Sequence, residues 1–262
     1  MTMPVRDDIL IELGLTPTWR RRDAQHTLIA TVAAEPPGHA FVPTMREPVP
    51  NASPDAFDQP RLPRIAALTW QDLAADVDAC AACGLCRTRN KSVPGVGDPR
   101  AQWFFVGEAP GAEEDARGEP FVGQAGRLLD NMLAALGLAR DRNVYIANVL
   151  KCRPPNNRTP EPAEAEACRP YLERQIELAR PRLIVALGKS AASLLLGTDA
   201  TIASLRGRVH RYHGLPLIVT YHPAYLLRSL PDKAKAWEDL VLARRTVTAT
   251  AEQGVTSATT AV

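Results

Sequence analysis

The feature that most constrains this chain is a series of short, almost wholly apolar runs that alternate with amphipathic stretches between residues 68 and 247. Strands buried on both faces of a parallel sheet have this texture, because neither face meets water. The predicted strands span residues 103–106, 144–149, 183–187, 209–212 and 217–221. The predicted helices span 124–136, 161–179, 189–196 and 233–245, and another helix leads into Cys80. This order predicts an α/β fold, a three-layer α/β/α sandwich around a central, mostly parallel, short-stranded sheet.

The segments on either side lack this alternation. Residues 1–68 contain 10 of the 23 prolines, and such a stretch cannot bury enough apolar surface to offset its ordering entropy. Within it only residues 5–15 have a helical period, and they are too few to form a stable helix alone. The sequence therefore predicts a disordered N-terminal arm over 1–68, a folded domain over 69–247 and a flexible tail over 248–262.

Composition excludes several classes of protein. The 31 basic and 29 acidic residues leave a net charge of only +2, and no apolar run approaches the roughly 18 residues that span a bilayer. The first residues carry acids where a signal peptide needs a basic start. We therefore expect a cytoplasmic protein without a membrane partner. Five cysteines in such a chain favour thiolate ligands or free thiols over disulfides.

Three predicted strands are followed by polar or glycine-rich segments, at residues 107–123, 148–160 and 221–228. The carboxyl ends of parallel strands meet at one edge of a sheet, so these segments are expected to converge on one crevice. Each alone is also compatible with ordinary turn chemistry. The Gly188-Lys189-Ser190 sequence does not indicate an ATPase, because the earlier glycine of a phosphate-binding loop is replaced by Leu183.

Four motifs in these segments resemble the family 4 uracil-DNA glycosylases, the iron-sulfur members of the uracil-DNA glycosylase superfamily. They are GEAPG at 107–111, GEPFVG at 118–123, ANVLKCRPP at 147–155 and HPAYLLR at 222–228. The resemblance covers residues 72–245 in the family's order and does not extend to the arm. It implies that the domain is catalytic and removes uracil from DNA with water as the nucleophile, leaving an abasic site. The expected partner is uracil-containing DNA, single- or double-stranded, and the expected state is a monomer.

Four cysteines form a candidate metal site. A C-x-x-C pair followed by two distant cysteines suits zinc or an iron-sulfur cluster, and buried free thiols are the alternative. The resemblance implies a structural [4Fe-4S] cluster whose ligands are Cys80, Cys83, Cys152 and Cys168. Cys86 makes a second C-x-x-C with Cys83, so it is an alternative to Cys80 and otherwise a spare thiol.

A glycosylase needs an aromatic surface for the flipped base, hydrogen bonds to its Watson-Crick edge and a way to stabilise the departing anion. The resemblance implies that Phe121 stacks on uracil. It implies that the Asn148 carboxamide donates to O4 and accepts from N3–H, a pattern that cytosine does not satisfy. His222 is expected to hydrogen-bond O2 and stabilise the developing negative charge. Without the resemblance, the alternatives are a core residue for Phe121, a turn former for Asn148 and a structural role for His222.

The GEAPG motif is expected to hold the attacking water. Glu108 follows a strand directly, where a carboxylate can orient or deprotonate water and favour a cationic sugar. The best-known members of the superfamily carry Asp and Tyr where this chain has Ala109 and Gly111, so the identity of the base stays open. Asp115 is a second candidate carboxylate. The other expected substrate-binding residues of the motif are Gly107, Ala109, Pro110 and Gly111.

Residues 201–245 are locally basic, with eight lysines and arginines against three acids. Such side chains neutralise DNA phosphates and set affinity without reading sequence. The predicted contacts are Arg206, Arg208 and Arg228. Either Leu226 or Leu227 is expected to wedge into the gap left by the flipped nucleotide, the alternative being core packing.

Two rival functions remain at this point. The first is a uracil-DNA binding protein that crosslinks to its target without turnover. Relatives of that kind carry a histidine-containing insertion, and the loop at 153–160 is short and lacks histidine, which favours turnover. The second is a zinc-stabilised nucleic-acid module. A Schiff-base mechanism is disfavoured because the only lysine in the motif loops is Lys151, beside a candidate ligand.

Overall fold

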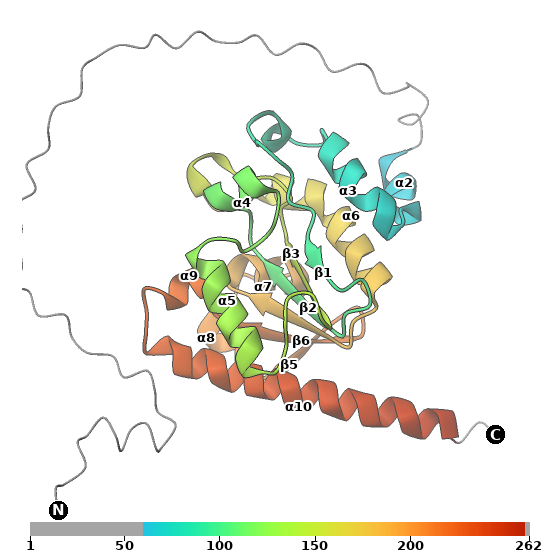
Figure 1. Ribbon diagram of the computed structural model, residues 1–262, viewed down its shortest axis with the longest axis vertical. Helices are drawn as coiled ribbons and strands as arrows, with labels where there is room; N and C mark the ends of the chain where they lie inside the picture. Colours follow the sequence, from blue (N-terminus) through green and yellow to red (C-terminus); the bar gives the residue numbers. More distant parts are fainter. Residues whose placement is uncertain (1–59, 260–262) are drawn as a thin grey trace, which may run out of the picture. The chain divides into compact units, whose positions relative to one another are not determined.

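The structure is a computed structural model that describes the backbone of residues 60–259 and the side chains of residues 60–250 (Figure 1). The predicted helix at 5–15 and most of the predicted arm lie outside these residues. The described strands are β1 Val96–Gly97, β2 Trp103–Gly107, β3 Val144–Asn148, β4 Leu183–Leu187, β5 Val209–Tyr212 and β6 Leu215–Thr220. The longer helices are α3 Trp70–Ala79, α5 Gln124–Ala135, α6 Pro162–Ala179, α7 Lys189–Leu196 and α10 Asp232–Thr259. Short helices are α2 Arg61–Ala67, α4 Ala112–Arg117, α8 Ile202–Leu205 and α9 Pro223–Leu226, with 3-10 turns η2 Gly84–Arg87 and η3 Pro155–Asn157.

The strands form one mixed sheet in the order β1-β3-β2-β4-β6-β5. The four central strands are parallel, and β1 and β5 pair antiparallel at the two edges. The predicted mostly parallel sheet is therefore confirmed. The register places Gly107 of β2 directly opposite Asn148 of β3, so two of the candidate segments leave the sheet side by side.

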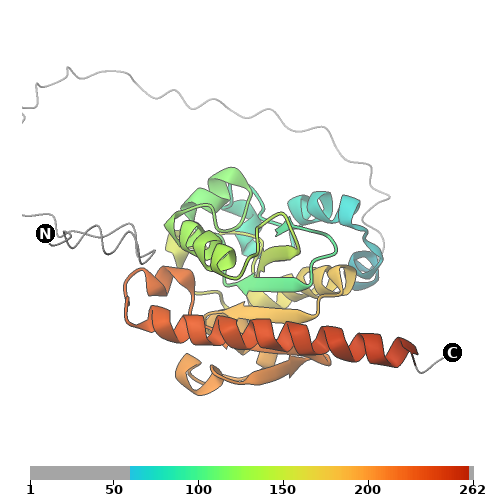
Figure 2. The same cartoon turned by 60° about the horizontal axis from the view of Figure 1, so that its bottom comes forward.

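Alternate residues of each central strand enter different cores, as the pleat requires. Phe104 and Val106 of β2 pack in the core shared with α6 and α7, whereas Trp103 and Phe105 pack in the core shared with α5 and α10. In Figure 1, α10 is the long red helix beneath the sheet, and in Figure 2 it passes in front of it. Helices thus cover both faces, which confirms the predicted α/β/α sandwich.

The folded domain begins earlier than predicted. Helix α2 packs against α6 through Ile65, which is 1% exposed. Arg64 forms an ion pair with Asp76 of α3, and Arg174 of α6 donates to the carbonyl of Leu68 at 2.7 Å. The predicted arm boundary at residue 68 is therefore wrong for residues 61–68. The prolines at 60 and 63 suggested an irregular chain, but Pro63 lies in the first turn of α2, where proline is tolerated.

The C-terminal helix also continues beyond its predicted end at residue 245. The backbone is helical to Thr259, so most of the predicted tail at 248–262 is helical. Within this helix, the hydroxyls of Thr246 and Thr250 donate to carbonyls four residues earlier at 2.9 and 2.8 Å. No helix among residues 60–259 is long and apolar enough to cross a membrane.

Candidate active site

The candidate site lies at the carboxyl edge of the sheet, where β2, β3 and β6 end. Gly107 is buried between two site residues: a Cβ there would lie 2.3 Å from Asn148 Oδ1 and 2.6 Å from the Phe121 ring. Any side chain at this position would therefore displace both neighbours. The structure brings Gly107, Asn148 and Phe121 together, as predicted for a common site.

Asn148 has the environment of a ligand-binding amide. It is 2% exposed, and its Oδ1 atom has no hydrogen-bond partner within the described protein. Unsatisfied buried polar atoms are rare and costly. Its backbone is fixed instead: buried Lys151 donates Nζ–H bonds to the Asn148 carbonyl at 2.8 Å and to Gln175 Oε1 at 2.7 Å. The Asn148 backbone is thus held in place, and its side-chain oxygen is positioned to accept a hydrogen bond from a ligand.

Phe121 is buried, at 6% exposed, and stacks against a second site residue. Its ring centroid lies 5.5 Å from that of His222, with an interplanar angle of 29°. Its φ of 56° lies in the left-handed region, which an aromatic residue rarely adopts. The ring is therefore part of a hydrophobic core and also borders the candidate site. The core position and the site position, which the sequence presented as alternatives, are both occupied by this one ring.

His222 caps the short helix α9, and its Nδ1 accepts a hydrogen bond from the Ala224 N–H at 3.2 Å. Because Nδ1 accepts, a neutral ring carries its proton on Nε2. Burial, together with the positive charge of Arg228, lowers the pKa of His222 to about 4. The ring is therefore neutral at physiological pH and has one N–H free to donate.

Glu108 directly follows β2 and accepts a hydrogen bond at 2.7 Å from the hydroxyl of Ser190. Ser190 lies in the first turn of α7, so it orients this carboxylate from the neighbouring strand's loop. The sequence predicts no role for Ser190, because the segment at 188–190 does not fit a phosphate-binding loop. Its position after the buried strand β4 was the available signal.

Glu114 is a second residue that the sequence did not single out. One carboxylate oxygen accepts from Gly111 N–H at 3.0 Å, and the other accepts from Val122 and Gly123 N–H at 3.0 and 3.2 Å. The carboxylate therefore ties the GEAPG motif to the segment that carries Phe121. The glycine three residues before this glutamate, at the start of α4, was the available signal.

Asp115, the second candidate carboxylate, has a different hydrogen-bond partner from Glu108. It is 1% exposed, and its two oxygens accept from the backbone N–H and side-chain Nδ2 of Asn90 at 2.9 and 2.6 Å. The structure thus gives Asp115 a partner in the loop after η2. Ala109 and Pro110 lie between Glu108 and Gly111 on the loop that Glu114 holds.

The predicted metal ligands converge on one cavity. It is lined by Cys80, Cys83, Cys86, Cys152 and Cys168, together with Val77, Lys151 and Tyr171. Two of these sulfurs accept hydrogen bonds: Arg89 Nη1 donates to Cys152 Sγ at 2.9 Å, and the backbone N–H of Lys151 donates to Cys168 Sγ at 3.3 Å. Within residues 60–259, no three potential ligands are grouped closely enough to hold a single metal ion.

Burial and neighbouring charges act on three of the thiols around this cavity. Burial raises the pKa of Cys83 and Cys152, and that of Cys168 to about 11. Negative charge on Cys80 raises the pKa further at all three, and negative charge on Cys86 adds to the rise at Cys83. Cys80 and Cys86 both line the cavity, so the choice of Cys80 as the fourth ligand stays a prediction.

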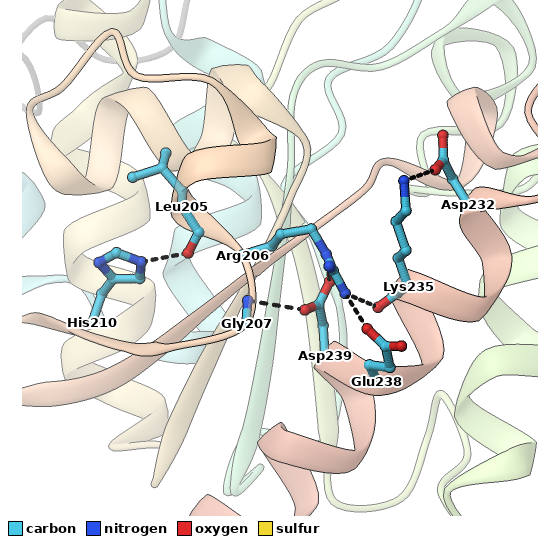
Figure 3. Close-up of polar contacts among 8 residues, drawn as sticks. All are labelled: Leu205, Arg206, Gly207, His210, Asp232, Lys235, Glu238 and Asp239. Carbon is cyan, nitrogen blue, oxygen red and sulfur yellow. Dashed lines mark hydrogen bonds and ion pairs between the residues drawn. The ribbon is translucent and has the colours of Figure 1, made fainter.

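The predicted DNA contacts have different environments. The guanidinium of Arg206 is held by helix α10, where it bonds Glu238 at 2.9 Å, Asp239 at 3.1 Å and the Lys235 carbonyl at 2.5 Å (Figure 3). Asp239 is fully buried and also accepts from Gly207 N–H. Arg206 therefore joins the loop before β5 to α10, a role that a charge count cannot reveal. Arg208 and Arg228 are exposed.

The two candidate wedge residues also differ. Leu226 is 1% exposed and lines an apolar groove with α5 and α10, whereas Leu227 is 39% exposed. Tyr225 stacks on Tyr221 with ring centroids 5.1 Å apart, and its hydroxyl donates to Asp232 at 2.6 Å. Leu226 is therefore a core residue. Leu227 is exposed at the end of α9, and the contacts of Tyr225 hold this segment in place.

Comparison with known proteins agrees with this geometry. Residues 94–241 match the Uracil DNA glycosylase superfamily. The chain belongs to this superfamily. It is 48% identical to the type-4 uracil-DNA glycosylase of Archaeoglobus fulgidus over 60% of this chain and 82% of that protein. It is also 48% identical to the Thermotoga maritima type-4 enzyme over 61% of this chain and 83% of that protein. A type-5 enzyme of Pyrobaculum aerophilum is 37% identical over 52% of this chain and 67% of that protein. The predicted family 4 membership is confirmed.

Proposed function

We propose that this protein is a DNA repair enzyme that flips uracil out of DNA and hydrolyses its N-glycosidic bond, leaving an abasic site. The observation that carries the proposal is the orphaned Oδ1 of Asn148, buried beside the Phe121 ring at the end of the sheet. Membership of the type-4 family supports the same activity.

In this proposal Phe121 stacks on the flipped base and Asn148 reads its edge. Asn148 Oδ1 accepts from uracil N3–H, and its Nδ2 donates to O4. Cytosine presents an acceptor at N3 and an amino donor at position 4, so both contacts would become repulsive. Discrimination of this kind rests on leaving buried polar groups unpaired with the wrong base. Backbone support from Lys151 keeps the amide oriented.

In this proposal, His222 and Glu108 promote cleavage of the N-glycosidic bond. The N1–C1′ electron pair moves to the uracil ring, and neutral His222 donates its Nε2–H to O2, where negative charge develops. Glu108, oriented by Ser190, holds the water whose oxygen bonds to C1′. The water's proton leaves to the carboxylate or to solvent, and the uracil anion is later protonated. The carboxylate charge also favours the cationic sugar of the transition state.

We further propose that Cys80, Cys83, Cys152 and Cys168 hold a structural [4Fe-4S] cluster. All four line one cavity, and four thiolates are the usual ligands of such clusters. The cluster would crosslink three parts of the chain: the end of α3, the loop after β3, and α6. The hydrolysis described above does not involve the cluster.

The DNA duplex or single strand is proposed to contact exposed Arg208 and Arg228, with Leu227 as the wedge. Arg206 is proposed to support this surface through α10. We place the catalytic domain from residue 61 onward and propose that it acts as a monomer.

The deciding experiment incubates the purified protein with oligonucleotides that contain a single uracil, thymine or cytosine, and then treats them with alkali. Alkali-dependent scission at uracil alone is the expected result. A protein–DNA adduct that survives denaturing electrophoresis, without turnover, would instead support the crosslinking alternative. Binding without either product would support a nucleic-acid module.

A further inference from the structure

The conformation of Phe121 requires an explanation that the proposed mechanism does not supply. Its φ of 56° is unfavourable for a bulky side chain, and such residues persist only where the surroundings over-determine them. The ring is nonetheless buried against Gly107 and His222. Some contact outside the base-binding pocket must therefore hold the backbone in this state.

Arg140 makes that contact from the loop between α5 and β3. Its Nη1 donates to the carbonyl of Pro120 at 2.6 Å, and its Nη2 donates to the carbonyl of Phe121 at 2.8 Å. Its Nε and Nη2 also donate to Asp130 Oδ1 at 3.1 and 2.9 Å. One planar guanidinium thus links two consecutive carbonyls to a carboxylate of α5, a geometry that a lysine cannot reproduce.

The other neighbours of the segment leave this arrangement little freedom. A Cβ at position 126 would lie 1.7 Å from the Phe121 carbonyl oxygen, so only glycine allows α5 to approach so closely. On the next two residues, the Val122 and Gly123 N–H groups are bonded to Glu114. The Phe121 carbonyl is therefore confined between the first turn of α5 and the Arg140 guanidinium.

We infer that Arg140 is a positioning residue, which holds Phe121 in the left-handed conformation so that its ring forms the stacking surface for the base. Arg140 acts through the two peptide groups that flank Phe121, whose carbonyls belong to Pro120 and Phe121. Without it, the peptide is free to relax toward negative φ, and the ring would rotate out of its place beside Asn148 and His222. The inference rests on the proposed stacking role of Phe121.

The test compares Arg140→Met with Arg142→Met, an exposed arginine in the same loop, in the full-length protein. The measurements are single-turnover excision rate, inhibition by free uracil, melting temperature and iron content. Arg140→Met should lower the excision rate on the order of 10- to 100-fold, as expected when a group moves by about 1 Å. It should also weaken inhibition by uracil while iron content is unchanged. Arg142→Met should stay within about twofold of the parent.

A double-mutant cycle with Phe121→Leu separates positioning from general stabilisation. In the Phe121→Leu background, Arg140→Met should have no further effect on excision, because the ring that it positions is gone. The same fold-loss in both backgrounds would overturn the inference, as would full activity of Arg140→Met. If Arg140→Met does not fold, Asp130→Asn, which loosens only the anchor, takes its place in the cycle with the same expected non-additivity.

The outcomes also distinguish this inference from the function on which it rests. A parent protein that does not excise uracil contradicts the proposed function. An active parent whose Phe121→Leu variant keeps full activity contradicts the stacking role. Loss of activity in Phe121→Leu together with full activity in Arg140→Met contradicts only the inference about Arg140.

Discussion

The base-binding pocket and the cysteine cavity contain residues only four positions apart in the chain, Asn148 and Cys152. They are nevertheless organised in opposite ways. In the pocket, the folded chain already holds the side chains in the states that their roles need. His222 is an example, because burial and the positive charge of Arg228 lower its pKa and keep the ring neutral for donation. In the cavity, burial raises the pKa of Cys152 and Cys168, which disfavours the thiolates that bind metal.

This difference indicates that the cysteine cavity depends on a bound metal group for its final structure, whereas the base-binding pocket does not. A pocket preorganised by its own fold should tolerate loss of a recognition group without losing structure. A cavity of buried thiols from three chain segments gains its final order only when a metal group displaces the protons. The four predictions below test this contrast, in order of decreasing effect.

The largest effect is expected from Cys152→Ala. Removing a ligand from the cavity should abolish iron binding and yield insoluble or unfolded protein, because the loop after β3 loses its link to α3 and α6. Iron and acid-labile sulfide, at about four each per chain in the parent, are the measurements. Cys86→Ala is the matched control and should retain both. Equal iron loss in the two variants would contradict the assignment of Cys86 as the spare thiol.

Asn148→Asp should affect the pocket alone. It replaces the NH2 donor by an acceptor that faces uracil O4, and the expected fall in excision rate is on the order of 10²-fold or more. Melting temperature, iron content and affinity for abasic DNA should stay nearly unchanged. Loss of the cluster together with activity would show that the two regions are not independent.

Deleting residues 1–68 should destabilise the side of the domain that carries Cys80, since it removes α2 and buried Ile65. A loss of roughly 2 to 4 kcal/mol in unfolding free energy is expected from an emptied core site. Thermal melting is the measurement, and deletion of residues 1–59, which spares α2, is the control. Excision of uracil from short oligonucleotides should survive in the shorter deletion. Identical melting of both proteins would show that α2 does not support the cavity.

The smallest effect concerns the protonation of His222. Its pKa of about 4 in the folded protein lies below the ordinary value of 6.5, so the unfolded chain takes up this proton first as pH falls. This group's contribution to stability is complete above pH 6.5 and is lost between about pH 6.5 and 4, by at most about 3 kcal/mol. Excision should likewise persist to about pH 5 and then decline. The check is the pH profile of melting for the parent minus that for His222→Gln, and a flat difference would contradict it.

The sequence alone determined the layers of the fold and the place of the site. Wholly apolar runs such as residues 183–187 predict buried parallel strands, because only burial on both faces tolerates them. The motifs at their carboxyl ends then predict one shared crevice that includes Glu108, Asn148 and His222. Both inferences depend on residue patterns that are local, so the order of residues is enough to support them.

Tertiary structure decided which partner each side chain meets. Arg206 counts as a free positive charge in the sequence, but the fold brings it to Glu238 and Asp239, which lie 32 and 33 residues further along the chain. Ser190 and Arg140 belong to no motif. They meet Glu108 and the Phe121 carbonyl only because β4 lies beside β2 and the loop after α5 returns to the segment that precedes this helix. Hydrogen bonds and ion pairs act over about 3 Å, and only the folded chain determines which groups come that close.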